Sequence, residues 1–204
     1  MQYILGVDGG NTKTDYFLFD TNGNFIDFYR GGTCSHEGLR DSFDGSYRVM
    51  KEVFDAFFAK NDITASDITA AVFGLAGVDV PFQKEKLEEV VTKLGFKKFA
   101  VVNDSFLGIK AGTSKGYGVC SINGTGTSSG GIDSKQNYLQ VGGIGQICGD
   151  EAGGYHISRR VVRAAYDTAY RFGKETSLFP IVMDFLNVTD KYYLMEAISN
   201  YYLT

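Results

Sequence analysis

Asp8-Gly9-Gly10-Asn11-Thr12-Lys13-Thr14 joins the first apolar run of the chain, Tyr3 to Val7, to the second, Thr14 to Phe19. Two adjacent glycines let the backbone turn tightly, so that its amides and the Thr12 hydroxyl can face a phosphate group. A carboxylate at the tip of the first strand, Asp8, can hold Mg²⁺ directly or through water. The stretch therefore predicts a phosphate-binding turn, with an ordinary glycine hairpin as the alternative.

A second glycine-rich stretch, Asn123-Gly124-Thr125-Gly126-Thr127-Ser128-Ser129, lies between two further strand-like runs, at 118–122 and 127–132. Its amides and hydroxyls can form a neutral cradle for phosphate oxygens, although a hairpin turn is again the alternative. Two such hairpins in one chain arise by chance much less often than one. This second pair of runs also mirrors the first pair, which predicts an internal structural repeat.

A pair of polar residues, Asn103-Asp104, follows the apolar run 99–102 and precedes a predicted helix. In an α/β sheet, side chains at the carboxyl ends of strands face the crevice where ligands bind. Phosphoryl transfer to an alcohol uses a carboxylate that accepts the hydroxyl proton, a role that Asp104 could fill. The competing interpretation is that Asp104 is the N-cap of the helix.

The densest glycine cluster runs from Gly142 to Tyr155, where six of fourteen residues are glycine, and it contains Asp150-Glu151. Bare backbone can pack against a flat polar ligand, and the two acids can accept hydrogen bonds from vicinal hydroxyls. A loop with helix-capping acids is the alternative. Two weaker candidates are the polar segment 33–37, in which His36 contacts a substrate or lies on the surface, and the turn 74–77.

The remaining pattern predicts an α/β protein. Strands are expected at 3–7, 14–19, 25–29, 68–73, 99–102, 118–122 and 127–132, and helices at 44–60, 81–94, 105–112, 151–172, 180–186 and 190–203. The order β-β-β-α-β-α-β restarts after the helix at 105–112. The boundary between two domains is therefore predicted near 112–116, with one domain at 1–114 and the other at 115–204.

The composition is that of an ordinary globular protein, with 204 residues, 44% hydrophobic and 22% charged residues and a net charge of −4. No basic stripe favours nucleic acid, and no run of about 20 apolar residues predicts a membrane span. The first residues lack the basic lead-in of a signal peptide. Three cysteines without paired spacing indicate reduced thiols, so we expect a cytoplasmic location.

Taken together, these stretches resemble the sugar kinase/actin/Hsp70 superfamily. The two glycine-rich hairpins are similar to its two phosphate motifs, and Asn103-Asp104 is similar to its first connecting motif. The stretches 142–145 and 149–155 resemble N-acetylglucosamine kinases and the activator ATPases of benzoyl-CoA reductase and 2-hydroxyacyl-CoA dehydratase. The resemblance implies a ribonuclease H-like (actin-like ATPase) α/β fold that is duplicated, with the second domain truncated.

The resemblance also implies roles for individual residues. Asp8 would lie near Mg²⁺, Asp104 would be the catalytic base, and two further groups would hold ligands. ATP phosphates would contact Gly9, Gly10, Asn11, Thr12, Gly124, Thr125, Gly126 and Thr127, and the sugar would contact Ser35, His36, Gly77, Gly143, Gly145 and Asp150. Three positions depart from the kinase pattern: Ser35 replaces Asn, Ile144 stands where Trp is common, and Ala76 replaces Ser.

The function expected from this resemblance is transfer of the ATP γ-phosphate to a hydroxyl of an N-acetylhexosamine such as N-acetylglucosamine. An activator ATPase and a non-catalytic nucleotide or sugar sensor are the alternatives. The cofactors would be ATP and Mg²⁺ and the partner a small sugar, with a homodimer left open. Because the family's C-terminal adenosine motif is absent from the 204 residues, we expect an incomplete purine pocket and low ATP affinity.

Overall fold

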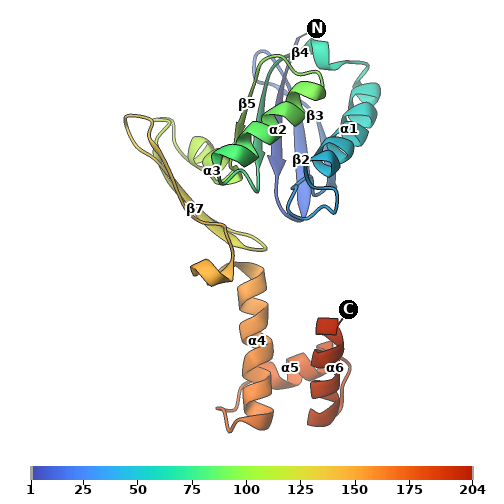
Figure 1. Ribbon diagram of the computed structural model, residues 1–204, viewed down its shortest axis with the longest axis vertical. Helices are drawn as coiled ribbons and strands as arrows, with labels where there is room; N and C mark the ends of the chain where they lie inside the picture. Colours follow the sequence, from blue (N-terminus) through green and yellow to red (C-terminus); the bar gives the residue numbers. More distant parts are fainter. Residues whose placement is uncertain (1, 204) are drawn as a thin grey trace. The chain divides into compact units, whose positions relative to one another are not determined.

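The structure, a computed structural model, describes residues 2–203, with side chains as far as Asn200. Its contacts define two compact units, residues 1–150 and 151–204, which are shown in Figure 1. This division concerns packing, whereas the predicted boundary near residue 114 concerns the internal repeat and stays a prediction. No helix in the described range is both long enough and apolar enough to cross a membrane.

The first unit is built on a five-stranded sheet with the order β3-β2-β1-β4-β5. The first three strands form an antiparallel meander, and β4 and β5 run parallel to β1. The strands are β1 (Tyr3–Gly9), β2 (Lys13–Asp20), β3 (Phe25–Gly32), β4 (Ile68–Leu75) and β5 (Phe99–Val102). This is the ribonuclease H-like arrangement that was expected from the sequence.

Successive side chains of β4 point to opposite faces of this sheet, and helices pack on both faces. The Phe73 ring packs against Phe54 of α1 (Ser42–Asn61) at 6.3 Å between ring centroids. The next residue, Gly74, points the other way, where a Cβ atom would overlap Leu107 Cδ1 of α3 (Asp104–Gly112). Helix α2 (Pro81–Lys93) joins α1 over the Phe73 face (Figure 1). Helix α3 therefore approaches β4 closely only because residue 74 has no side chain.

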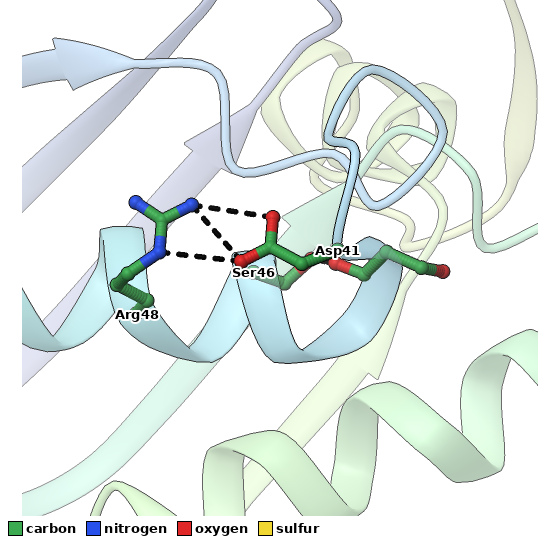
Figure 2. A network of polar contacts seen from close by, with 4 residues as sticks. Asp41, Ser46 and Arg48 are labelled. Carbon is green, nitrogen blue, oxygen red and sulfur yellow. Dashed lines mark hydrogen bonds and ion pairs between the residues drawn. The ribbon is translucent and has the colours of Figure 1, made fainter.

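The start of α1 is held by an ion pair rather than by a side-chain cap. Figure 2 shows the Asp41 carboxylate accepting hydrogen bonds from the Arg48 guanidinium, with the shortest at 3.1 Å. A Cβ atom at Gly45 would collide with Asp41 Oδ1, so the glycine leaves room for the carboxylate above the helix. Both partners are about half exposed, so solvent screens the pair and it contributes little to stability.

A second sheet in the same unit contains three antiparallel strands, β6 (Gly118–Asn123), β7 (Thr127–Ile132) and β8 (Tyr138–Gly142). One face of this sheet packs on α3, where the Phe106 ring meets the Tyr138 ring at 5.1 Å. The opposite face carries Val119, Leu139 and Val141, which are 85%, 67% and 63% exposed. Strand β8 was not predicted from the sequence, because the alternation Leu139-Gln140-Val141 is too short to be distinctive.

The hairpin turns that close the two meanders match at the level of individual hydrogen bonds. In the β2–β3 turn, Asp20 Oδ1 accepts from the backbone amides two and four residues later, and Asn24 Nδ2 donates to Asp20 Oδ2. In the β7–β8 turn, Asp133 and Asn137 form the same three bonds at the same spacing. Each meander thus closes with the same aspartate–asparagine turn, as expected of a duplicated fold.

The second unit contains three helices, α4 (Gly153–Tyr170), α5 (Leu178–Phe185) and α6 (Lys191–Leu203). All three were predicted, with ends that differ by one to two residues. Their small core consists of Ala165, Val182, Met183 and Leu194. The first of these helices was expected to begin at Glu151 but begins at Gly153, which has a φ of +81°.

Candidate active site

The two glycine-rich hairpins meet in the structure. Thr12 and Thr125, which are 113 residues apart in sequence, form a hydrogen bond of 2.8 Å between their Oγ1 atoms. Gly9 is tightly enclosed, since a Cβ atom there would lie 2.7 Å from Leu75 Cδ2. By contrast, nothing lies within 4 Å of a Cβ atom placed at Gly124 or Gly126. The second turn therefore leaves open space beside its backbone, next to the hydroxyl groups of Thr12 and Thr125.

The remaining residues of these turns differ in whether their polar groups are free to bind a ligand. Asn11 is exposed, and the Gly10 amide donates to the Lys13 carbonyl at 2.9 Å and closes the first turn. The Thr127 hydroxyl lies 3.1 Å from the Ile122 carbonyl and 3.0 Å from Asn123 Oδ1. Because one hydroxyl donates one hydrogen, Thr127 is engaged within its own hairpin, and its backbone is the part left to face a ligand.

Asp8 lies at the end of β1, opposite Asp15 on β2. Arg30 donates two hydrogen bonds to Asp15, of 2.6 and 2.8 Å, and this holds the pKa of Asp15 below its usual range. The pKa of Asp8 is raised, first by partial desolvation and then by the charge of Asp15. Asp8 is thus an exposed carboxylate whose neighbouring acid is already paired.

The carboxylate of Asp8 fits a magnesium ion of the kind that accompanies a nucleotide. Mg²⁺ is usually held by one or two carboxylates together with phosphate oxygens and water, and not by a full cage of protein ligands. Within residues 2–203, no group of three or more His, Cys, Asp or Glu side chains could hold a metal ion. Asp8 could therefore supply one carboxylate to such an ion.

Asp104 is not the N-cap of α3, which was the competing interpretation of this residue. The cap is Asn103, whose Oδ1 accepts hydrogen bonds from the Ser105 amide at 3.0 Å and the Ser105 hydroxyl at 2.6 Å. This arrangement leaves the Asp104 side chain free of the capping role. Burial, and then the charges of Asp8 and Asp79, raise the pKa of Asp104. A carboxyl group with a raised pKa is better suited to accept a proton.

Sequence reasoning missed Asp79, which the structure places at the same edge of the sheet. It follows β4, and its Oδ1 accepts a hydrogen bond of 3.0 Å from Asn103 Nδ2 and a second from Gln140 Nε2. The rule that ligand-binding groups follow the carboxyl ends of parallel strands applies to Asp79 as it does to Asp104. That rule was the available signal, but three residues separate Asp79 from Leu75, the last residue of β4.

The segment after β3 is drawn inward and is not a surface loop. Ser35 is 2% exposed and His36 is 8% exposed, so the alternative of a surface histidine is wrong. The His36 ring stacks on Phe43 at 4.3 Å, and burial lowers the pKa of His36, which favours the neutral ring. Ser35 Oγ and His36 Nδ1 are buried without a hydrogen-bond partner. Such orphaned polar atoms are costly, and a ligand that hydrogen-bonds to them would remove that cost.

Gly77 lies directly against His36. It adopts a φ of +80°, and a Cβ atom there would lie 2.7 Å from His36 Cε1 and 3.1 Å from His36 Nδ1. The Glu37 carboxyl carbon would be 3.3 Å from the same point. The two weaker sequence candidates, the segment 33–37 and the turn 74–77, are therefore parts of one cluster.

Asp150 organises the glycine cluster that precedes α4. Its Oδ2 accepts hydrogen bonds from the amides of Gly143 at 2.9 Å and Gly145 at 2.6 Å. These glycines have φ values of +88° and +119°, which other residues rarely adopt. The N-cap of α4 is Ala152, so Asp150 binds loop amides and does not cap the helix.

The fold and these side chains together define the class of protein. A duplicated α/β architecture with two glycine-rich turns in contact, and acids at the neighbouring strand ends, is that of an actin-like ATPase. The chain belongs to the BadF/BadG/BcrA/BcrD ATPase family, whose sequence profile matches residues 5–193.

Known relatives add names to this family assignment. The chain is 28% identical over 190 residues to the N-acetylmuramic acid/N-acetylglucosamine kinase of Clostridium acetobutylicum. It is 25% identical over 197 residues to the N-acetyl-D-glucosamine kinase of Dictyostelium discoideum. Each match covers 92% of this chain and 61% of the relative, so the chain spans less than two thirds of their length.

Among solved structures, the fold is similar to that of a Chromobacterium violaceum protein assigned as an N-acetylglucosamine kinase. The TM-score is 0.76 at 24% sequence identity, over 96% of this chain and 67% of that chain. At this level of identity the likeness concerns the fold.

Proposed function

We propose that this protein is an ATP-dependent kinase that transfers the γ-phosphate to a hydroxyl of an N-acetylhexosamine such as N-acetylglucosamine. The observation that carries the proposal is the environment of the Asp104 carboxyl group, which does not cap α3 and has a raised pKa. Asn103 takes over the capping of α3, and burial beside Asp8 and Asp79 raises the pKa of the freed carboxyl group. Phosphoryl transfer to an alcohol requires a base placed in this way beside a phosphate site. The names of the two curated relatives support the same reaction.

The phosphate side of the site would be formed by the two turns. The backbone of Gly9, Gly10, Gly124 and Gly126 and the hydroxyls of Thr12 and Thr125 would surround ATP phosphates, with Asn11 and Thr127 flanking them. Asp8 would hold Mg²⁺ between protein and phosphates, where the ion neutralises the charge of the transferred group. The protein supplies positioning and fixed donors, which account for most of the catalysis of phosphoryl transfer.

The sugar side would be formed by Ser35, His36, Gly77, Gly143, Gly145 and Asp150. Two of these residues carry the unpartnered polar atoms Ser35 Oγ and His36 Nδ1, which can hydrogen-bond to sugar hydroxyl or amide groups. Asp104 Oδ would accept the proton of the attacking hydroxyl. Ser35 in place of Asn, Ala76 in place of Ser and Ile144 in place of Trp are the positions at which the choice of sugar would differ from the kinases that the chain resembles.

The charge around these residues favours a neutral sugar. The Glu37 carboxyl group lies beside Gly77, and its pKa is raised by partial burial and by the charge of Asp79. The burial and the charge of Asp79 that disfavour the ionised form of Glu37 would likewise disfavour a sugar carboxylate, such as that of N-acetylmuramic acid. We therefore place N-acetylglucosamine ahead of N-acetylmuramic acid as the substrate.

The proposal is tested by measuring ADP release by the full-length gene product with Mg-ATP and four sugars: N-acetylglucosamine, N-acetylmuramic acid, glucosamine and glucose. We expect release that depends on N-acetylglucosamine and falls about 10²- to 10⁴-fold in Asp104→Ala. Asp133→Ala, in the β7–β8 turn, is the matched control and should retain activity. ADP release that no sugar changes would instead indicate an activator ATPase, and a folded protein that releases none would indicate a non-catalytic sensor.

A further inference from the structure

Asp79 connects three segments of the first unit whose relative positions matter for the proposed reaction. It lies between β4 and α2, Asn103 lies between β5 and α3, and Gln140 lies on β8. The two hydrogen bonds that meet at Asp79 Oδ1 span 24 and 61 residues of sequence. Contacts of this range hold separate elements together, whereas capping bonds act within one element.

The backbone of Asp79 is itself fixed. The amides of Asp79 and Val80 both donate to Gln83 Oε1 at 3.0 Å, which caps the start of α2. The side-chain nitrogen of Gln83 in turn lies 3.5 Å from His36 Nε2. The carboxylate of Asp79 therefore extends from an anchored turn.

One of its partners determines the position of Asp104. Both ends of the Asn103 side chain are engaged, because its Oδ1 caps the first turn of α3 and its Nδ2 donates to Asp79. Asp104 is the next residue and the first of that helix. A shift of Asn103 toward or away from Asp79 would thus move the first turn of α3 and the carboxylate it carries.

The other partner determines the position of the glycine cluster. Gln140 precedes Gly142-Gly143 on β8, and its Nε2 also lies 3.4 Å from the Gly142 carbonyl. A Cβ atom at Gly143 would lie 3.1 Å from Gln140 Nε2 and 3.7 Å from Asp79 Oδ1, so this backbone packs directly on the pair. Asp150 holds the same loop from its other end.

We infer that Asp79 is a positioning residue that aligns the Asp104 carboxylate with the Gly142–Gly145 backbone through the hydrogen bonds that its Oδ1 accepts from Asn103 and Gln140. This inference rests on the proposed function, because the alignment affects catalysis only if Asp104 is the base of a sugar kinase. The hydrogen bonds, and not the negative charge, carry the role. An asparagine at position 79 keeps an Oδ1 acceptor of the same shape and should therefore keep the alignment, whereas an alanine cannot.

The test compares Asp79→Ala and Asp79→Asn in the full-length gene product. We expect Asp79→Ala to lower kcat/KM for the sugar at least about 30-fold, since misplacement by about 1 Å can cost roughly 100-fold, while the KM for ATP stays within about threefold. Asp79→Asn should stay within about fivefold of the unchanged protein. Gln140→Met removes the donor of the hydrogen bond from Gln140 to Asp79 and should show the same loss as Asp79→Ala. This second variant keeps the test decisive if Asp79→Ala does not fold.

The matched control is Asp27→Ala. Asp27 on β3 also joins two elements, accepting from Lys60 Nζ at 2.8 Å and Asn61 Nδ2 at 2.9 Å at the end of α1. Its loss should lower stability without changing kcat/KM for the sugar. The inference is wrong if Asp79→Ala stays within threefold of the unchanged protein, if Asp79→Asn is as impaired as Asp79→Ala, or if Asp27→Ala is equally impaired.

Amide hydrogen exchange separates this inference from the proposed function. Exchange at 142–145 should be faster in Asp79→Ala than in the unchanged protein and unchanged in Asp79→Asn, whether or not a sugar is phosphorylated. A protein that phosphorylates no sugar but shows this exchange pattern would refute the kinase and keep Asp79 as the residue that positions the loop. Equal exchange in all three proteins would refute the inference.

Discussion

At the scale of single residues, the structure assigns different roles to Asn103 and Asp104, which the sequence leaves as equal candidates for the N-cap of α3. Asn103 and Asp104 both suit a helix N-cap, and Asp is among the residues preferred there. The choice falls on Asn103 because its amide can accept from Ser105 and donate to Asp79 at once, whereas an ionised carboxylate only accepts. Asp104 is left with the raised pKa that burial imposes.

This raised pKa leads to a prediction about stability. A carboxyl group whose pKa is higher in the folded than in the unfolded state stabilises the protein below its unfolded pKa, and that contribution is lost as the pH rises through the folded value. Wherever Asp104 is ionised, its charge therefore lowers the stability of the folded protein. Asp104→Asn should abolish sugar phosphorylation and yet melt at a higher temperature than the unchanged protein at pH 7.

Thermal unfolding at pH 7 and pH 5 measures this effect. The advantage of Asp104→Asn should be larger at pH 7 and smaller at pH 5, where the unchanged protein is closer to protonating Asp104. Asp15→Asn is the opposite case, because Arg30 lowers the pKa of Asp15 and the pair stabilises the charged form. That variant should melt at a lower temperature at pH 7. Equal melting of Asp104→Asn and the unchanged protein at pH 7 would contradict the argument.

At the scale of elements, the position of α3 depends on a missing side chain. Gly74 allows the Cγ and Cδ1 atoms of Leu107 to lie where a Cβ atom would otherwise be. Since Asp104 is in the first turn of the same helix, the close approach of α3 to β4 also brings the acid to the strand ends. The helix–sheet contact is therefore part of the site.

Gly74→Ala should displace α3, lower stability by about 1–3 kcal/mol and reduce sugar phosphorylation. Leu107→Ala removes the atoms that the new methyl group would strike. The double variant Gly74→Ala/Leu107→Ala should therefore be more stable than the sum of the two single changes by about 1 kcal/mol or more. Denaturant unfolding of the four proteins provides this comparison, and strictly additive effects would show that the two residues do not compete for space.

At the scale of the whole molecule, the described part of the first unit carries a β-sheet face of exposed apolar side chains. Val119, Leu139 and Val141 come from β6 and β8 and share one face, because Val119 and Leu139 both pair with Gly131. The residues of the other face, such as Ile132 at 3% exposure, pack inward. Contiguous exposed apolar side chains of this kind favour association with other surfaces.

We expect the 204-residue chain to bind a hydrophobic dye through this face. Replacing Val119, Leu139 and Val141 by threonine, which keeps a high strand propensity, should lower dye fluorescence and aggregation with little change in melting temperature. Ile132→Thr is the matched control on the buried face and should lower the melting temperature. Unchanged dye fluorescence in the triple variant would place the exposed surface elsewhere in the chain.

The sequence by itself determined the features that depend on neighbouring residues. The alternation of β1 and β2, the glycine turns at 8–14 and 123–129 and the helical spacing of α1 and α2 were all predicted, because periodicity and turn chemistry act over a few residues. The family's motifs lie in the same local stretches. The ribonuclease H-like fold and the phosphate turns could therefore be predicted from the order of the residues alone.

Only the tertiary structure decided the contacts between distant segments. The hydrogen bond from Thr12 to Thr125 and the bonds of Asp79 to Asn103 and Gln140 join residues 113, 24 and 61 positions apart. The burial of Ser35 and His36 without hydrogen-bond partners likewise results from how β3, α1 and the turn at Gly77 pack. No local pattern encodes such pairings, because each one depends on where the hydrophobic core places whole elements.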